Sequence, residues 1–288
     1  MNLLTPYLSS HMFMCMKLNP KKIIDLYWFS GSGNTLFIAK IIAEFLGENG
    51  FEVNLKPIEN TNPSNVDINN TIGLAIPVAE QGTYPFIWEF INNLPSPALD
   101  GLTGCDIFMV DTLMLYSGGI KGPVKKILKA KGFNLLGAKE IIMPNSLMKL
   151  KNQRSKDKLK MEKGRLTAEN FTRDLITGQA VWKDIPLYSD MMASFSKKDS
   201  TWNVFRKYFP LKVDNTKCTR CRLCERICPE NSWTYDKDRY EMNWLKTDCI
   251  YCLRCFSYCP VEAITYGKKN YLRHKPLTAG AFSVSKYK

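Results

Sequence analysis

The chain has 288 residues, of which 45% are hydrophobic and 23% are charged, a composition typical of globular proteins. No apolar run approaches the about eighteen residues that a membrane helix needs, and the first sixteen residues lack the basic start and the cleavage site of a secretory signal, so we expect a cytoplasmic protein. The formal net charge of +13 would suit a nucleic-acid binder, but no recognition module for nucleic acid is readable.

The first pattern along the chain is a strand that leads into a loop of glycines and hydroxyl side chains. Residues 21–29 have strand propensity, residues 30–35 read Ser-Gly-Ser-Gly-Asn-Thr, and apolar residues recur at helical spacing over 36–46. Backbone amides at such a helix start point at an anion. The loop has no lysine for a Walker motif, and Leu36 stands where a Rossmann fingerprint has its third glycine. The pattern therefore predicts a phosphate loop with neutral ligands, with a plain glycine turn as the alternative.

Strands and helices alternate after this loop, as a doubly wound parallel sheet requires. Five strands are predicted at 21–29, 51–58, 71–78, 106–112 and 139–143, and four helices at 36–46, 86–94, 123–131 and 155–177. Ligands of such sheets bind beyond the carboxyl ends of the strands. The loops after the third and fourth strands should therefore flank the ligand, and each offers a tyrosine, Tyr84 or Tyr116, for stacking. Aromatic residues in loops also serve packing alone, and that alternative stays open.

The loop at 30–35 resembles the loop S/T-x-T/S-G-N-T that holds the FMN phosphate in flavodoxins. The resemblance implies a flavodoxin-like fold with a bound FMN. The predicted FMN contacts are Ser30, Ser32, Gly33, Asn34, Thr35, Pro77, Val78, Tyr84, Tyr116, Ser117, Gly118 and Gly119. Flavodoxins usually place acidic residues near the flavin ring, whereas Glu80 is the only one in the two flanking loops. This departure leaves the redox tuning of the flavin open.

Two further stretches of the first two thirds of the chain carry patterns of their own. Lysine and arginine are concentrated between 149 and 165, opposed only by Asp157 and Glu162. These cations are Lys149, Lys151, Arg154, Lys156, Lys158, Lys160, Lys163 and Arg165. They indicate either a solvated helix face or a docking surface for an acidic partner. Residues 179–210 hold many aromatic residues with little period, which predicts a connector with a short helix near 202–209 or, alternatively, the wall of a substrate pocket.

Eight of the ten cysteines lie in two copies of the spacing C-x2-C-x2-C-x3-C-P, at 218–229 and 249–260. This spacing wraps thiolates around a cubane iron–sulfur cluster, and the fourth cysteine of each copy ligates the other cluster. We therefore assign one 4Fe–4S cluster to Cys218, Cys221, Cys224 and Cys259, and a second to Cys249, Cys252, Cys255 and Cys228. The alternatives are disulfides or zinc, but zinc sites use two CxxC pairs, without the third cysteine and the Cys-Pro found here.

The remaining cysteines and the histidines fit no site. Cys105 is predicted to pack at the start of the fourth strand, and Cys15 lies in the N-terminal tail. His11 and His274 also lie in the tails, so that no catalytic residue is assigned.

Residues from about 21 to 267 resemble the family of flavodoxin-like domains fused to a two-cluster ferredoxin, known from anaerobes. The predicted fold class is α/β, a five-stranded doubly wound parallel sheet followed by a small α+β ferredoxin-like domain. The predicted parts are a tail at 1–20, an FMN domain at 21–178, a connector at 179–210, a two-cluster domain at 211–268 and a tail at 269–288. The cluster domain is expected to pack near the mouth formed by the loops of Tyr84 and Tyr116.

The resemblance implies electron transfer between FMN and the two clusters. The predicted partner is an acidic ferredoxin or flavodoxin, since the chain stays basic even after ligated clusters and a flavin phosphate offset part of its formal charge. The alternative is a reductase that passes cluster electrons through FMN to a small-molecule acceptor. No nucleic-acid partner is expected, and a homo-oligomer is left open.

Overall fold

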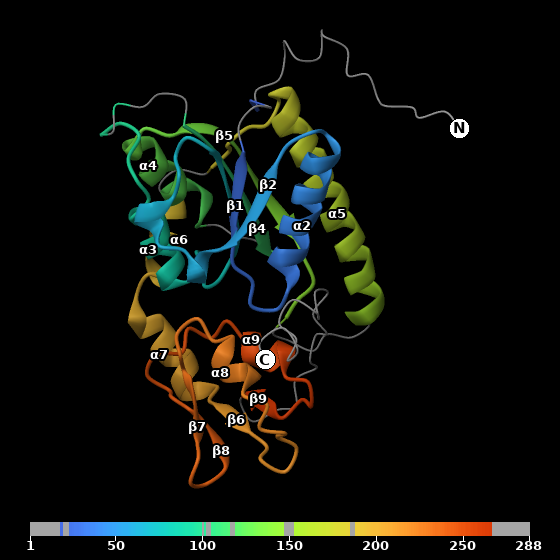
Figure 1. The fold of residues 1–288 in the computed structure, drawn as a ribbon, viewed down its shortest axis with the longest axis vertical. Helices are drawn as coiled ribbons and strands as arrows, with labels where there is room; N and C mark the ends of the chain where they lie inside the picture. The colour runs from blue at the N-terminus through green and yellow to red at the C-terminus, as the bar shows by residue number, and fades with distance from the viewer. Residues whose placement is uncertain are drawn as a thin grey trace.

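The structure is a computed structural model that describes residues 18–19, 23–99, 101, 105–115, 119–146, 153–184 and 188–266. Figure 1 shows a larger α/β part above a smaller part built from the last third of the chain. Within the described ranges, none of the helices combines the length and the apolar character that crossing a membrane demands.

The larger part is a five-stranded, fully parallel sheet in the order β2-β1-β3-β4-β5. Its strands are β1 (Ile24–Trp28), β2 (Val53–Pro57), β3 (Thr71–Pro77), β4 (Asp106–Leu113) and β5 (Asn134–Ile142). This is the strand order of flavodoxin-like doubly wound sheets, with the switch point between β1 and β3. The predicted fold class is confirmed.

The sheet is covered by helices on both faces. α2 (Asn34–Glu48) and α5 (Gln153–Thr177) pack on one face, and α3 (Pro85–Asn92) and α4 (Lys121–Lys131) on the other. Side chains of a strand alternate between the faces. In β4, Phe108 and Val110 therefore join the core under α2 and α5, while Ile107 and Met109 join the core under α3 and α4.

β5 begins at Asn134, earlier than the predicted start at 139. Gly137 obscured the strand in the sequence because glycine lowers strand propensity. The glycine is required by packing, since a Cβ at this position would lie 2.7 Å from the Cβ of Ala180. Cys105 is buried directly before β4, as predicted. Cys15, His11 and His274 lie outside the described residues.

The connector contains two helices, α6 (Tyr188–Ser196) and α7 (Asp199–Tyr208). The second extends the predicted short helix, and the first was not predicted. Ser196 at the end of α6 fixes both neighbours, because its Oγ accepts a hydrogen bond from Trp88 Nε1 of α3 at 3.0 Å and its carbonyl accepts one from Trp202 Nε1 of α7 at 3.0 Å. Through these two bonds, the end of α6 connects α3, which packs on the sheet, to α7, which leads into the smaller part.

The smaller part contains two short antiparallel ladders and two short helices. The strands are β6 (Leu211–Val213) with β9 (Ile264–Tyr266) and β7 (Trp233–Asp236) with β8 (Glu241–Trp244); the helices are α8 (Leu223–Arg226) and α9 (Arg254–Tyr258). β7 and β8 form an antiparallel hairpin between the two cysteine motifs. The residues directly after Cys259 form a turn, and the two helices lie inside the two cysteine motifs. The 3-10 turns η1 (Ile58–Asn60) and η2 (Pro63–Asn65) follow β2.

Asp25 on β1 is a buried carboxylate that bonds to the edge strand β2 and to the residue before β3. It accepts hydrogen bonds from Lys56 Nζ at 2.8 Å, Asn54 Nδ2 at 3.1 Å and Asn70 Nδ2 at 3.1 Å. Replacing Asp25 with alanine is expected to lower the free energy of unfolding at pH 7 by about 2–3 kcal/mol, since a hydrogen bond to a charged group contributes about 1.5–3 kcal/mol. Urea unfolding measures the loss, and Asp67→Ala at an exposed position is the matched control.

The loss in Asp25→Ala should depend on pH. Burial by itself would raise the pKa of Asp25, but the hydrogen bonds from Lys56, Asn70 and Asn54 and the Lys56 charge outweigh burial and leave this pKa below its ordinary value. A lowered pKa in the folded state gives stability that is complete above the unfolded-state pKa of about 3.9 and is lost as the pH falls through the folded-state pKa. An equal loss at pH 7 and near pH 3 would contradict this account.

Candidate functional site

The loop at 30–35 joins β1 to α2 as a cradle of backbone amides. Gly33 has a φ of 97°, a left-handed conformation that favours glycine, and its amide donates to Ser30 Oγ at 3.0 Å. α2 then starts at Asn34, with no acidic residue in its first turn. The positive end of the helix dipole therefore faces the loop without a competing carboxylate. This is the local geometry that binds a phosphate.

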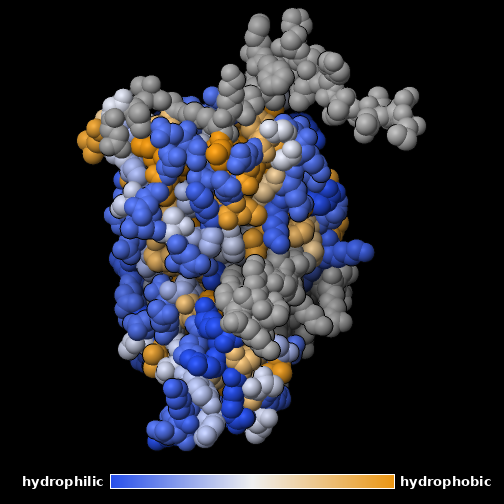
Figure 2. All heavy atoms as spheres, in the orientation of Figure 1, coloured by the Kyte–Doolittle hydropathy of each residue, from blue (hydrophilic) through white to orange (hydrophobic). Residues whose placement is uncertain are grey.

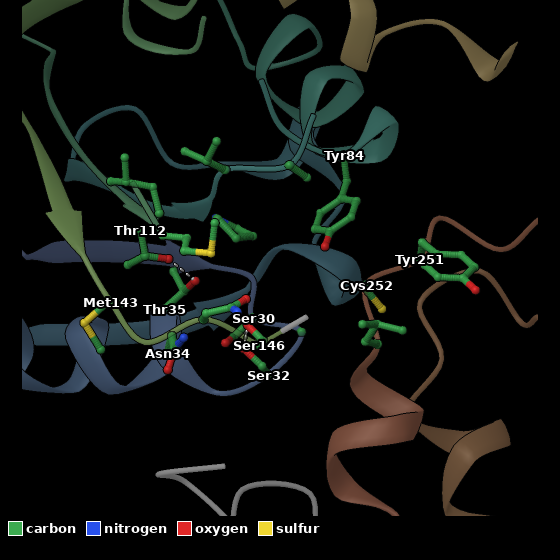
Figure 3. A pocket seen from close by; sticks show the side chains of 18 of the residues that line it. Ser30, Ser32, Asn34, Thr35, Tyr84, Thr112, Met143, Ser146, Tyr251 and Cys252 are labelled. Atoms are coloured by element: carbon green, nitrogen blue, oxygen red, sulfur yellow. Dashed lines mark hydrogen bonds between the residues drawn. The ribbon is translucent and has the colours of Figure 1, made fainter. Parts of the chain in front are cut away.

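A cavity of about 250 Å³ lies in front of this loop (Figure 3). Seven of the predicted FMN contacts line it: Ser30, Ser32, Asn34, Thr35, Pro77, Val78 and Tyr84. Gly33 shapes the loop but does not line the cavity. Gly119 is buried and does not line the cavity either. Tyr116, Ser117 and Gly118 lie outside the described residues. The structure thus brings the loops after β1 and β3 together around one cavity.

The segment after β5 packs against the loop at 30–35 from the other side, and this contact was not predicted. Asn34 Nδ2 donates to the carbonyl of Pro144 at 2.9 Å, and Ser32 Oγ donates to Ser146 Oγ at 2.9 Å. Thr35 shares a 2.7 Å hydrogen bond with Thr112 at the end of β4. The amide oxygen of Asn34 is buried and has no hydrogen-bond partner among the described residues. It remains an acceptor available to a ligand.

The loop after β3 brings an acidic side chain to the cavity. Glu80 lines the cavity from a tight turn, with a φ of 48°, and burial raises the pKa of its carboxyl above the ordinary value. Gly82 closes the turn against α6, where a Cβ would come closer to Ser196 than 3.0 Å. Glu80, the only acidic residue in the two loops predicted to flank the flavin ring, therefore faces the cavity.

A row of aromatic rings forms the wall opposite the sheet. Tyr84 lies 5.4 Å from Trp202, Trp202 lies 6.3 Å from Phe205, and Phe205 lies 5.6 Å from Tyr251, measured between ring centroids. Trp202 and Phe205 come from α7, so the connector contributes to the site. Sequence reasoning left this role open because the aromatic residues of 179–210 have no regular spacing.

The eight motif cysteines surround two cavities in the smaller part. The first cavity is lined by Cys218, Cys221, Cys224 and Cys259, the second by Cys228, Cys249, Cys252 and Cys255, and Cys255 also reaches the first. The fourth cysteine of each motif therefore lies with the first three of the other. Among the described residues, no group of three or more His, Cys, Asp or Glu side chains is placed to hold a single metal ion.

The surroundings of these cysteines fit buried iron–sulfur clusters. Burial raises the pKa of Cys224 to about 12, that of Cys249 to about 11 and that of Cys252 to about 12, so thiolates there need a bound cation for compensation. Backbone amides also point at the sulfurs, since Ser232 N donates to Cys228 Sγ at 3.2 Å and Ala263 N to Cys259 Sγ at 3.3 Å. Such hydrogen bonds help set a cluster's potential.

Apolar side chains beside the cysteines also limit the access of water to the sulfurs, since Ile227, Ile250 and Ile264 are all buried.

The two sites meet at Cys252. Tyr251, Cys252 and Leu253 line the cavity in front of the phosphate loop, opposite Ser30 (Figure 3). Gly31 packs so tightly on the carbonyl of Cys252 that a Cβ there would come closer to this oxygen than 3.0 Å. The cluster part therefore lies near Tyr84, as expected, and its second motif forms one wall of the cavity.

Exposed cations flank the first cysteine motif in sequence. Cys218, Cys221, Cys224 and Cys259 are half-buried, whereas Lys217, Arg220, Arg222 and Arg226 are exposed. Lys217 pairs with Asp214, and Arg222 pairs with Glu225. Figure 2 shows strongly hydrophilic residues over the lower part of the molecule. In the predicted basic stretch, Arg165 pairs with both Glu162 and Glu169. Lys149 and Lys151 lie outside the described residues, as does the side chain of Arg154.

Comparisons with known proteins found one family match and several similar solved structures. Residues 217–263 match the family described as a 4Fe-4S dicluster domain. A solved structure of two-electron reduced Megasphaera elsdenii flavodoxin is 20% identical, with a TM-score of 0.37, covering 51% of this chain and 99% of that one. A flavodoxin from the domain Archaea is 9% identical (TM-score 0.37, 53% of this chain and 97% of that one), and the flavodiiron protein from Giardia intestinalis is 12% identical (TM-score 0.36, 57% and 38%). No curated protein matches the chain.

The chain thus combines a sheet with the strand order of flavodoxins and a segment, residues 217–263, that matches the 4Fe-4S dicluster family. This is the combination that the sequence resemblance implied.

Proposed function

We propose that this protein transfers electrons between an FMN in the cavity at 30–35 and two 4Fe–4S clusters held by the eight motif cysteines. The observation that carries the proposal is the double position of Cys252, which belongs to the second cysteine set and also lines the cavity of the phosphate loop. FMN takes up two electrons and can release them singly, whereas each cubane passes one. The contact of Gly31 with Cys252 would hold FMN and the second cluster close together, as internal transfer needs.

The proposed division of the chain follows from these roles. Residues 21–178 form the FMN domain and residues 211–268 the two-cluster domain. The connector at 179–210 supplies Trp202 and Phe205 to the cavity wall and Arg206 to the cluster domain, where its Nη1 donates to the carbonyl of Cys249 at 3.2 Å. The connector is therefore part of the site in this proposal.

The phosphate role of the loop predicts a difference between two flavins. Ser32 is half-buried at the cavity, so Ser32→Glu would place a carboxylate beside the phosphate of FMN. We expect its affinity for FMN to fall at least tenfold, about 1.4 kcal/mol, while its affinity for riboflavin, which has no phosphate, changes little. Flavin fluorescence titration measures both, and Ser32→Gln is the neutral control of matched size. Equal losses for the two flavins would contradict a phosphate site.

The exchange partner is proposed to be an acidic ferredoxin or flavodoxin that docks at the first cysteine set. This set lies away from the cavity of the phosphate loop, is more exposed than Cys249 and Cys255, and is bordered by Lys217, Arg220 and Arg222. Opposite charges speed the encounter of two proteins, and salt screens this attraction.

The function is tested by anaerobic cofactor analysis followed by electron exchange. The protein should contain about eight irons and one FMN per chain. It should also reduce or oxidise an acidic two-cluster ferredoxin at a rate that falls steeply as salt is added. Zinc in place of iron, or a failure to bind FMN, would refute the proposal.

The aromatic wall favours a second candidate, a reductase for a small planar acceptor. Trp202 and Phe205 cover the cavity from α7, and a stacked acceptor could be held against such rings. A reductase would turn over a small acceptor with saturation and without strong salt dependence. An electron carrier would reduce small acceptors without saturation, and its exchange with an acidic protein partner would depend strongly on salt.

A further inference from the structure

Arg254 is a buried arginine that reaches from one cofactor site to the other. It lies between Cys252 and Cys255 in the second motif and is only 2% exposed, although arginine is almost never fully buried unless it is paired. Its Nε donates to the carbonyl of Ser30 at 3.0 Å, across 224 positions of sequence. One side chain therefore connects the second cysteine motif to the phosphate loop.

Three further contacts hold the guanidinium. Nη1 donates to the carbonyl of Ile227, the residue before Cys228, at 3.1 Å and lies 2.6 Å from Glu59 Oε1 of η1. The guanidinium carbon also lies 4.5 Å from the centroid of the Phe29 ring at the end of β1. Arg254 thus contacts both cysteine motifs and the loops after β1 and β2.

The ion pair with Glu59 places two opposite charges in a nearly dry site. The side chain of Glu59 is 9% exposed, and that of Arg254 is 2% exposed. Charges interact more strongly where water is excluded, and breaking a buried pair leaves the other charge uncompensated. Removing either partner would therefore change the electric potential at the neighbouring cysteines. Loss of Arg254 would make it more negative, and loss of Glu59 would make it more positive.

We propose that Arg254 is a positioning residue that fixes the cluster domain on the phosphate loop and, together with Glu59, sets the reduction potential of the cluster assigned to Cys228, Cys249, Cys252 and Cys255. This inference rests on the proposed function, since it takes both cofactors as bound. A cluster gains negative charge when it is reduced. A nearby positive charge therefore favours the reduced form, and a nearby negative charge favours the oxidised form.

The test is a redox titration of the full-length protein with its cofactors, followed by electron paramagnetic resonance. Arg254→Met leaves the negative charge of Glu59 without its partner and should lower the reduction potential of the second cluster. Glu59→Gln leaves the positive charge of Arg254 without its partner and should raise this potential. Each shift should be at least tenfold in the reduction equilibrium, about 59 mV for one electron. The double variant should return towards the wild-type value. The cluster of Cys218, Cys221, Cys224 and Cys259 is the internal reference and should shift less.

Arg254→Lys separates position from charge. It keeps the positive charge but loses the planar fork that reaches the carbonyls of Ser30 and Ile227. We expect its cluster potential to stay near the wild-type value while its affinity for FMN falls, because the phosphate loop loses its anchor. Shifts in the same direction for Arg254→Met and Glu59→Gln, or no shift in either, would overturn the inference.

Failure to fold does not block the test, since Glu59→Gln alone must raise the potential, and a fall or no change overturns the inference. The failure of the proposed function is a separate result. It would appear as missing iron or missing FMN in the wild-type protein, before any variant is compared.

Discussion

Replacing Cys252 with alanine is expected to remove one of the two clusters and to stop internal electron transfer to the flavin. Cys252 lines the second cysteine cavity and also the cavity of the phosphate loop, so that one substitution affects the point where both sites meet. A cubane needs four thiolate ligands, and alanine supplies none. The iron content of anaerobically purified protein should fall from about eight to about four atoms per chain. Alanine is preferred to serine because a serine oxygen can itself ligate iron.

Cys105→Ala is the matched control for this experiment. Cys105 is also buried, but it lies directly before β4 and outside both motifs. It should keep about eight irons per chain, with at most a modest loss of stability. Rapid mixing with a reductant of the clusters then measures transfer to the flavin, which should persist in Cys105→Ala and be lost in Cys252→Ala. A Cys252→Ala protein with unchanged iron would contradict the ligand assignment.

The local parts of the two sites could be predicted because their chemistry lies in contiguous sequence. The spacing of the cysteine motifs constrains which thiols can gather, and Cys228, Cys249, Cys252 and Cys255 line one cavity in the structure. The phosphate loop is likewise a short run between a strand and a helix. Gly33, with its left-handed φ, shows why the loop needs glycine at that position.

The contacts between distant segments could not be predicted in the same way. The bond from Arg254 to Ser30 joins residues at opposite ends of the chain, and nothing at either position indicates the other. Trp202 and Phe205 were recognised only as aromatic residues of a connector, because their role depends on where α7 packs. The early start of β5 was missed because Gly137 serves contact with Ala180 rather than strand propensity.

The loop at 30–35 and the loop of Cys252 can lie this close together because residue 31 is a glycine. Gly31 has no left-handed φ, so its absence of a side chain serves close approach rather than backbone conformation. A Cβ at this position would meet the carbonyl oxygen of Cys252 at less than 3.0 Å and its carbonyl carbon at 3.1 Å. These are backbone atoms of a cluster loop, so they cannot rotate away as the end of a flexible side chain could.

Gly31→Ala is therefore expected to lower the free energy of unfolding by about 1–3 kcal/mol, the usual cost of overpacking, and to slow electron transfer between cluster and flavin. Gly47→Ala is the matched control, because a Cβ there meets nothing within 4 Å and alanine inside a helix stabilises by about 0.5–1 kcal/mol relative to glycine. Chemical denaturation should thus give opposite signs for the two changes from glycine to alanine. If Gly31→Ala left both stability and transfer unchanged, the contact between Gly31 and Cys252 would not be what holds the two cofactor sites together, and the route through Cys252 would have to be abandoned.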